Sequence, residues 1–145
     1  MTATSSVKYL VAIILGLAYV SLAIAFWGWY VMNHPINELL LDIFAKQGHM
    51  LLYRASIFAH DALVNLLLAA PAAVAFIKIN ALNNWKYVIV AVLSALVGSY
   101  WSMDLSALPS LLQNWSFWAG LCLSIFSLPI AYLAAKSISS KAKSR

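Results

Sequence analysis

A group of polar side chains interrupts an otherwise apolar stretch near residue 60, and their types suit proton or ion chemistry. They are Arg54, His60, Asp61 and Asn65. On a helix, Arg54, Asp61 and Asn65 share one face because of their spacing along the chain. A carboxylate inside a bilayer costs roughly 2.5–3.5 kcal/mol on insertion scales, so it normally has a partner or faces water. The set therefore predicts a proton or ion relay, or a substrate anchor, in which Asp61 acts with Arg54 or His60.

A purely structural interpretation of the same side chains is also open. Asp61 can reach water if it lies about one turn below the outer interface, and Arg54 can extend to the headgroups. Asn65 can hydrogen-bond a neighbouring helix. Because the polar residues cluster at one end of their helix and not at its centre, the structural interpretation is favoured.

Motifs for covalent or metal chemistry are absent from the sequence. It contains no Gly-x-Ser-x-Gly, no glycine-rich phosphate loop and no Cys-x-x-Cys. A surface metal site could combine a histidine with Asp42 or Glu38, but the histidines are scattered and lack the spacing of metal ligands. The histidines are His34, His49 and His60. We therefore expect no catalytic residue, no metal site and no cofactor.

The composition indicates which solvent surrounds the chain. Of 145 residues, 64% are hydrophobic and 9% are charged, whereas soluble domains have about half and about a quarter. So much apolar surface does not fit inside one small soluble core. The single cysteine, Cys122, lies in an apolar run and forms no intrachain disulfide, so we interpret it as a packing residue.

Four stretches meet or approach the roughly 20 apolar residues that a membrane crossing needs. They are residues 7–32, 57–77, 85–101 and 115–135. Lipid cannot hydrogen-bond a free backbone amide, so these stretches must be helices. The sequence predicts one transmembrane domain, residues 1–145, with the all-α fold of an integral membrane four-helix bundle.

The first stretch could instead be a cleaved signal peptide. Ala23, Ile24 and Ala25 form a small-x-small cleavage pattern. The apolar run continues through Trp29 to Met32, however, which makes it long enough to cross. We expect it to be retained as a membrane helix.

Lysine and arginine positions predict the orientation of the chain. With four crossings, seven cations fall on one side, whereas the acidic residues of the two opposite loops are balanced only by Lys46 and Arg54. Positive residues mark the cytoplasmic side, so both termini are expected in the cytoplasm, in a bacterial inner membrane. The net charge of +5 is then a topology signal and not a nucleic-acid surface. The seven cations are Lys8, Lys78, Lys86, Lys136, Lys141, Lys143 and Arg145, and the acidic residues are Glu38, Asp42 and Asp104.

Two further patterns concern packing. Residues 36–47 have apolar side chains at helical spacing, which predicts an amphipathic interfacial helix ended by Gly48. Small residues recur every four positions in the third and fourth stretches, which is typical of helices that pack closely within or between subunits. These small residues are Ala91, Ala95, Ser99, Gly120 and Ser124.

The stretch from Arg54 to Asn65, RASIFAHDALVN, partly resembles the second-helix motif of the small four-helix glutathione-handling membrane enzymes. That motif has an Arg, a His or Gln, an Asn and a following Glu at fixed spacing. Here the Glu is missing and the spacing differs by about one residue. The expected topology also places the stretch outside, where cytosolic thiol is scarce, so we do not assign the chain to that family.

The favoured hypothesis is a non-enzymatic role. The chain would act as an accessory, immunity, exclusion or assembly subunit through helix–helix contact with a larger membrane protein, or through self-association. One alternative is an ion- or proton-coupled transporter or channel subunit that uses Asp61 and helices kinked at Pro71 and Pro129. Another is a small membrane enzyme acting on a lipid, a quinone or an apolar thiol-conjugation substrate with His60 and Asp61.

Overall fold

The computed structural model describes residues 5–33, 36–79, 82–101, 103 and 105–143, and in these residues every regular element is a helix. Four helices are long, and four short helical segments lie in the loops. The long helices are α1 (Ser5–Asn33), α3 (Met50–Lys78), α4 (Trp85–Tyr100) and α6 (Trp115–Lys143). The short segments are α2 (Ile36–Leu40), the π-helix η1 (Leu41–Ala45), the 3-10 helix η3 (Leu105–Ala107) and α5 (Leu108–Leu111).

Three helices, α1, α3 and α6, are long and apolar enough to cross a membrane, which supports the prediction of a membrane protein. Only 22% of the most apolar window of each is buried inside the molecule. The fourth helix, α4, is apolar but has 16 residues. At 1.5 Å per residue it is about 24 Å long, shorter than a hydrocarbon core of about 30 Å.

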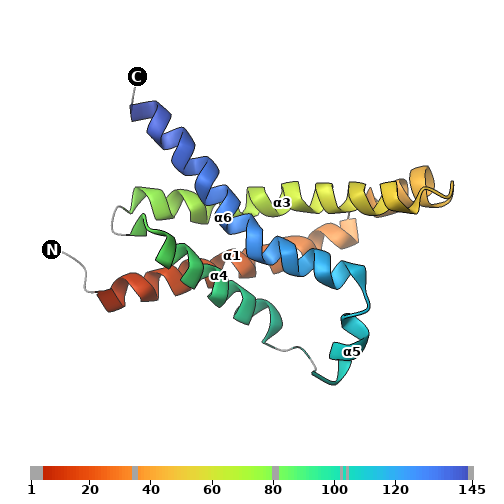
Figure 1. Cartoon of the computed structure of the whole chain (residues 1–145), viewed down its shortest axis with the longest axis horizontal. Helices are drawn as coiled ribbons and strands as arrows, with labels where there is room; N and C mark the ends of the chain where they lie inside the picture. Colours follow the sequence, from red (N-terminus) through yellow and green to blue (C-terminus); the bar gives the residue numbers. More distant parts are fainter. Residues whose placement is uncertain (1–4, 34–35, 80–81, 102, 104, 144–145) are drawn as a thin grey trace.

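The long helices alternate in direction and form two closely packed pairs (Figure 1). α1 packs mainly on α4, and α3 packs mainly on α6, with weaker contacts joining α4 to α6 and α1 to α3. We call the end where α1 and α4 begin and α3 and α6 finish the terminal end. The opposite end, which carries α2, η1 and α5, is the loop end.

The outer faces of the helices, which point away from the neighbouring helices, are also apolar. Leu67 of α3 and Val97 of α4 are 65% and 56% exposed, and many other large apolar residues are similarly uncovered. A helix that is apolar on its outer face as well as its inner face is typical of a membrane span.

The tightly packed core lies toward the terminal end. Phe76, Val88, Leu128 and Tyr132 are fully buried there among buried alanines. The Tyr132 hydroxyl donates to Oδ1 of Asn83 at 2.6 Å, which ties α6 to the turn between α3 and α4. Buried polar groups in a stable core are normally hydrogen-bonded in this way.

Close approach of α1 and α4 depends on Gly16. A Cβ at this position would meet the carbonyl oxygen of Ala91 and the hydroxyl of Ser94. That hydroxyl donates to the carbonyl oxygen of Ala91 at 2.9 Å and to that of Ile13, across the helix interface, at 3.3 Å. Small residues on both helices thus allow main-chain approach, as in other membrane helix pairs.

The segment 36–47, expected as one amphipathic helix, is divided between α2 and η1. It packs against the first turns of α3, and the Tyr53 hydroxyl donates to Oδ1 of Asn37 at 2.7 Å. Gly48, at φ +84°, ends the segment as predicted, and His49 N–H donates to the Phe44 carbonyl. The left-handed conformation at Gly48 is the usual way to reverse a chain after a helical turn.

The helices extend beyond the predicted stretches. α3 begins at Met50 instead of residue 57, and α6 continues to Lys143 instead of ending near 135. α1 and α4 differ from prediction by one or two residues at their ends. Hydropathy marks the part of a helix that suits lipid, whereas backbone hydrogen bonding continues into polar sequence.

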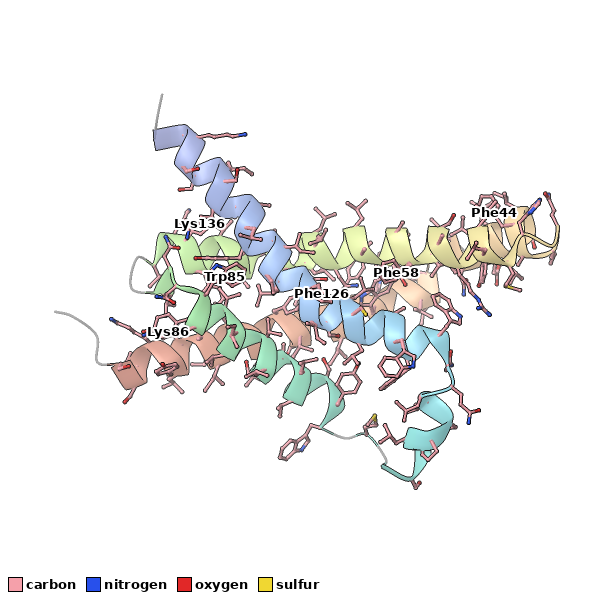
Figure 2. The ribbon with its side chains drawn as sticks, viewed as in Figure 1. Phe44, Phe58, Trp85, Lys86, Phe126 and Lys136 are labelled. Carbon is pink, nitrogen blue, oxygen red and sulfur yellow. The ribbon has the colours of Figure 1, made fainter. Side chains whose placement is uncertain are left out.

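Lysines gather at the terminal end, as Lys86 and Lys136 show beside Trp85, whereas Phe44 lies at the loop end (Figure 2). Lys86 lies over the rings of Tyr87, at 4.9 Å, and Tyr9, at 5.9 Å. Two residues of the charge pattern used to predict the orientation, Asp104 and Arg145, lie outside the described residues.

Candidate functional site

A chain of hydrogen bonds links α1 to the polar segment of α3 near the loop end. Nε2 of His60 lies 3.0 Å from the Tyr30 hydroxyl, and Nδ1 of His60 lies 2.9 Å from Oδ1 of Asp61. The side chains of His60 and Asp61 are 21% and 31% exposed. They therefore remain in contact with solvent space while being largely covered by the protein.

The partners of His60 determine where its protons lie. When Asp61 is ionised its oxygens only accept, so Nδ1 of His60 must carry a proton. Nε2 of the neutral ring then accepts the hydroxyl hydrogen of Tyr30, an assignment that follows from the hydrogen-bond network. A second proton on His60 would reverse the bond to Tyr30. The three groups can thus take up and pass on a proton without losing their contacts.

Asn65 lies one turn deeper and completes the polar set. Its Nδ2 donates to the Asp61 carbonyl at 2.8 Å, and its Oδ1 lies 3.5 Å from the indole nitrogen of Trp27 in α1. The Asn65 side chain is buried. Its contact with Trp27 is the interhelical role that the structural interpretation expected of it.

Three adjoining cavities surround these residues, and Asp61 borders each of them. The loop-end cavity, of about 590 Å³, lies between the end of α1, α2 and α3. The central cavity, of about 410 Å³, lies among α1, α3, α4 and α6, and the side cavity, of about 350 Å³, lies between α3 and α6. Asp61 therefore has open space on three sides.

Most of the small residues that sequence analysis assigned to packing border the central cavity. Ala95, Ser99, Gly120 and Ser124 all line it, whereas Ala91 is fully buried against Gly16. A Cβ added at Gly120 would meet nothing within 4 Å, and the Ser124 hydroxyl donates to the Gly120 carbonyl at 2.9 Å. Small side chains thus border open space here, while Ala95 also belongs to the buried core.

Arg54 does not pair with Asp61. Its guanidinium lies 5.7 Å from the ring centre of Trp115 at the start of α6, and the described residues contain no ion pair between Arg54 and Asp61. Seven residues of helix separate the two by about 10 Å along the axis. Arg54 and Asp61 therefore lie on one face of α3, as their spacing indicates, but too far apart along it for direct contact. The Arg54 side chain reaches α6 instead.

Metal ligands do not assemble among the described residues, where no group of three His, Cys, Asp or Glu side chains could hold an ion. His49 is exposed at the start of α3, away from the bonds that hold His60. His34 lies outside the described residues.

Tyr30 and Trp27 are the residues that sequence reasoning did not include in the site. They lie three residues apart in α1, so they share a face, and their rings meet edge to face at 5.5 Å. That shared face is the signal that could have brought them into the prediction, but nothing in one sequence shows that it faces His60.

No protein family model, no curated protein and no solved structure matches this chain. The function must therefore be argued from the site itself.

Proposed function

We propose that this membrane protein is a transporter or channel subunit for a cation, and that Asp61 is the carboxylate that binds it. One observation carries the proposal: Asp61 borders all three cavities near the loop end. A carboxylate kept within a membrane segment and next to open space is characteristic of ion and substrate pathways.

His60 and Tyr30 support this role for Asp61. The imidazole that donates to Asp61 can hold the carboxylate in one orientation, as a second group does in many proton relays. Because Tyr30 belongs to α1 and His60 to α3, a change in the charge of Asp61 would be felt at the contact between two helices. Such coupling is what an ion-driven movement requires.

The tight core toward the terminal end requires the helices to move during transport. Tyr19 borders the central cavity and interacts with Ser127 of α6, and beyond them the core is closed. Pro129 lies at the midpoint of α6, which changes direction along its length (Figure 1), and Pro71 lies within α3. A proline removes a helical hydrogen bond, so both positions are natural points for bending.

The proposed topology has four crossings with both termini in the cytoplasm, in a bacterial inner membrane. Trp85 and Tyr100 would place the two ends of the short α4 at the interfaces, with α2 and η1 at the outer leaflet. With Cys122→Ser as background, a cysteine introduced by Lys46→Cys should react with impermeant reagent in intact cells, and one introduced by Lys141→Cys should not. The opposite pattern would refute this orientation.

The test of function is cation flux into proteoliposomes that contain the purified protein. The unaltered chain should carry flux, and Asp61→Asn should abolish most of it, since the amide keeps the shape but loses the charge. Asp42→Asn is the matched control, because Asp42 is exposed, pairs with Lys46 and borders none of the three cavities. Flux that survives Asp61→Asn, or that falls equally in Asp42→Asn, would refute the proposal.

The other roles expected from the sequence stay predictions. They are the accessory, immunity, exclusion or assembly subunit that contacts a larger membrane protein, and the small enzyme that uses His60 and Asp61. The cavities around Asp61 favour the cation role over the accessory role, which does not require a carboxylate beside open space. They favour it over the enzyme because Asp61 borders three spaces, whereas one substrate site would suffice.

A further inference from the structure

The loop-end cavity has a negative lining. Glu38 and Asp61 both border it, and no lysine or arginine does. The cations closest in sequence to these acids make other contacts: Lys46 pairs with Asp42 and is only additionally attracted by Glu38, and Arg54 lies over Trp115. Among the described residues that line it, the cavity thus has two carboxylates, no lysine or arginine, and the imidazole of His60 bonded to Asp61. Such a lining favours a positively charged occupant.

The aromatic walls of the same cavity add to this preference. Trp27 meets the ring of Tyr30 at 82° and that of His60 at 75°. Tyr30 is itself stacked on both His60 and Phe26, so Trp27 forms a corner with the stacked Tyr30–His60 pair. Aromatic faces attract cations through their negative quadrupole, and they are the usual walls of sites for organic ammonium groups.

Amide groups provide further acceptors at the mouth of the cavity. Asn33 uses its Nδ2 to donate to the Trp29 carbonyl at 2.7 Å, which leaves its Oδ1 to accept. Asn37, which also borders the cavity, accepts from Tyr53 through Oδ1. An ammonium group with attached hydroxyl or N–H donors would find acceptors here as well as negative charge.

The size of the cavity suits a small molecule better than a bare ion. About 590 Å³ is within the roughly 300–1,000 Å³ range of small-molecule sites. A metal ion would need several ligands gathered around one point, and the described residues contain no such group. An apolar body with one positive charge matches both the volume and the mixed lining.

We propose that the loop-end cavity binds a small organic ammonium cation, held between the Glu38 and Asp61 carboxylates and the Trp27–Tyr30–His60 aromatic corner. The inference rests on the proposed function, since it names the class of cation that reaches Asp61. Either a free amine or the ammonium headgroup of a phospholipid has this chemistry.

Calorimetric titration of choline tests the inference, with the full chain in nanodiscs of phosphatidylglycerol, which carries no ammonium group. Choline should bind saturably, and its carbon isostere, in which carbon replaces the charged nitrogen, should not. Asp61→Asn should raise the Kd about tenfold, because a charge pair in a partly desolvated site contributes strongly. Glu38→Gln should raise it by about twofold to threefold, because Glu38 is exposed and exposed charge pairs contribute less. Asp42→Asn should leave the Kd unchanged. Thermal unfolding of each variant confirms that it is folded.

A second set of nanodiscs, made of phosphatidylcholine, separates the two sources of the ligand. Because anionic phosphatidylglycerol concentrates cations at its surface, the quantity compared is the ratio of the Kd of Asp61→Asn to that of the unaltered chain in each lipid. If lipid headgroups compete for the cavity, this ratio will be smaller in phosphatidylcholine, and if only free amines enter, it will be the same in both. The inference is overturned if choline gives no saturable heat in phosphatidylglycerol, if the isostere binds equally, or if Glu38→Gln and Asp61→Asn both leave the Kd unchanged.

The outcome is independent of the flux assay. Choline binding without any Asp61-dependent flux would refute the proposed transport and leave the site standing. Asp61-dependent flux of an inorganic cation without choline binding would refute the ammonium site alone.

Discussion

The hydroxyl of Tyr30 lies 3.0 Å from Nε2 of His60, and the two rings also stack at 5.6 Å. This pair joins α1 to α3, two helices that contact each other much less than either contacts its main partner. With the longer contact between Trp27 and Asn65, this polar contact joins the two helix pairs at the end where the cavities open. Because Nδ1 of His60 also contacts Asp61, the charge of Asp61 can affect the contact between Tyr30 and His60.

Removing the Tyr30 hydroxyl should weaken that contact. We expect Tyr30→Phe to lower the free energy of unfolding by about 0.5–1.5 kcal/mol, the usual net contribution of one hydrogen bond. In a His60→Ala background the same change should cost little, because the partner is already gone. Unfolding of the four proteins in one detergent measures the coupling. Equal losses in both backgrounds would show that the Tyr30 hydroxyl acts independently of His60.

Gly16→Ala should separate α1 from α4. The added methyl meets backbone at Ala91, which cannot move aside as a flexible side chain can, so we expect a loss of about 1–3 kcal/mol. Gly28→Ala is the matched control in the same helix, since nothing lies within 4 Å of its new Cβ. Alanine there should be neutral or stabilising, given its higher helix propensity. Thermal unfolding of both variants makes the comparison, and similar midpoints would contradict the packing at Gly16.

Filling the central cavity should block function without damaging the fold. Gly120 borders the central and side cavities and has open space at its Cβ position. Gly120→Leu should therefore unfold at or above the temperature of the unaltered chain while losing cation flux in proteoliposomes. A variant that keeps full flux would show that the pathway does not pass Gly120. Gly28→Leu, away from the cavities, is the control and should retain flux.

Lys46 provides a test of charge pairing in the loop. Its hydrogen bond to Asp42, together with the attraction of that carboxylate, raises the pKa of Lys46 above its ordinary value of 10.5. A raised pKa in the folded state contributes stability that is fully present below pH 10.5 and is lost as the pH rises through the folded value. The effect is small because the pair is exposed. Nitrogen NMR should show Lys46 titrating at lower pH in Asp42→Asn, and unchanged titration would exclude the pairing.

Hydropathy was sufficient to predict an all-helical chain with helices long and apolar enough to cross a membrane. The long apolar runs leave few other solutions, because a chain with so few charges must place its apolar side chains in lipid. Helix ends were predicted less well, since α3 starts a full two turns before its apolar stretch. The segment 36–47 formed two short elements instead of one helix because it packs along α3.

Contacts between helices were beyond the reach of one sequence. The spacing of Arg54 and Asp61 indicates a shared face but not which neighbouring helix that face meets, and Arg54 reaches Trp115 instead. Tyr30 and Gly16 gain their importance only from residues that lie far away in the chain. The polar residues of α3 could be singled out in advance, whereas the cavities around them depend on how the four helices fit together.

The central claim is that the Asp61 carboxylate binds a cation, and infrared difference spectroscopy of the membrane-embedded protein tests it most directly. The Asp61 carboxylate stretching band is identified as the band that is lost in Asp61→Asn and kept in Asp42→Asn, and adding potassium or choline should shift it. A spectrum of the unaltered protein in which neither cation shifts this band would contradict the account.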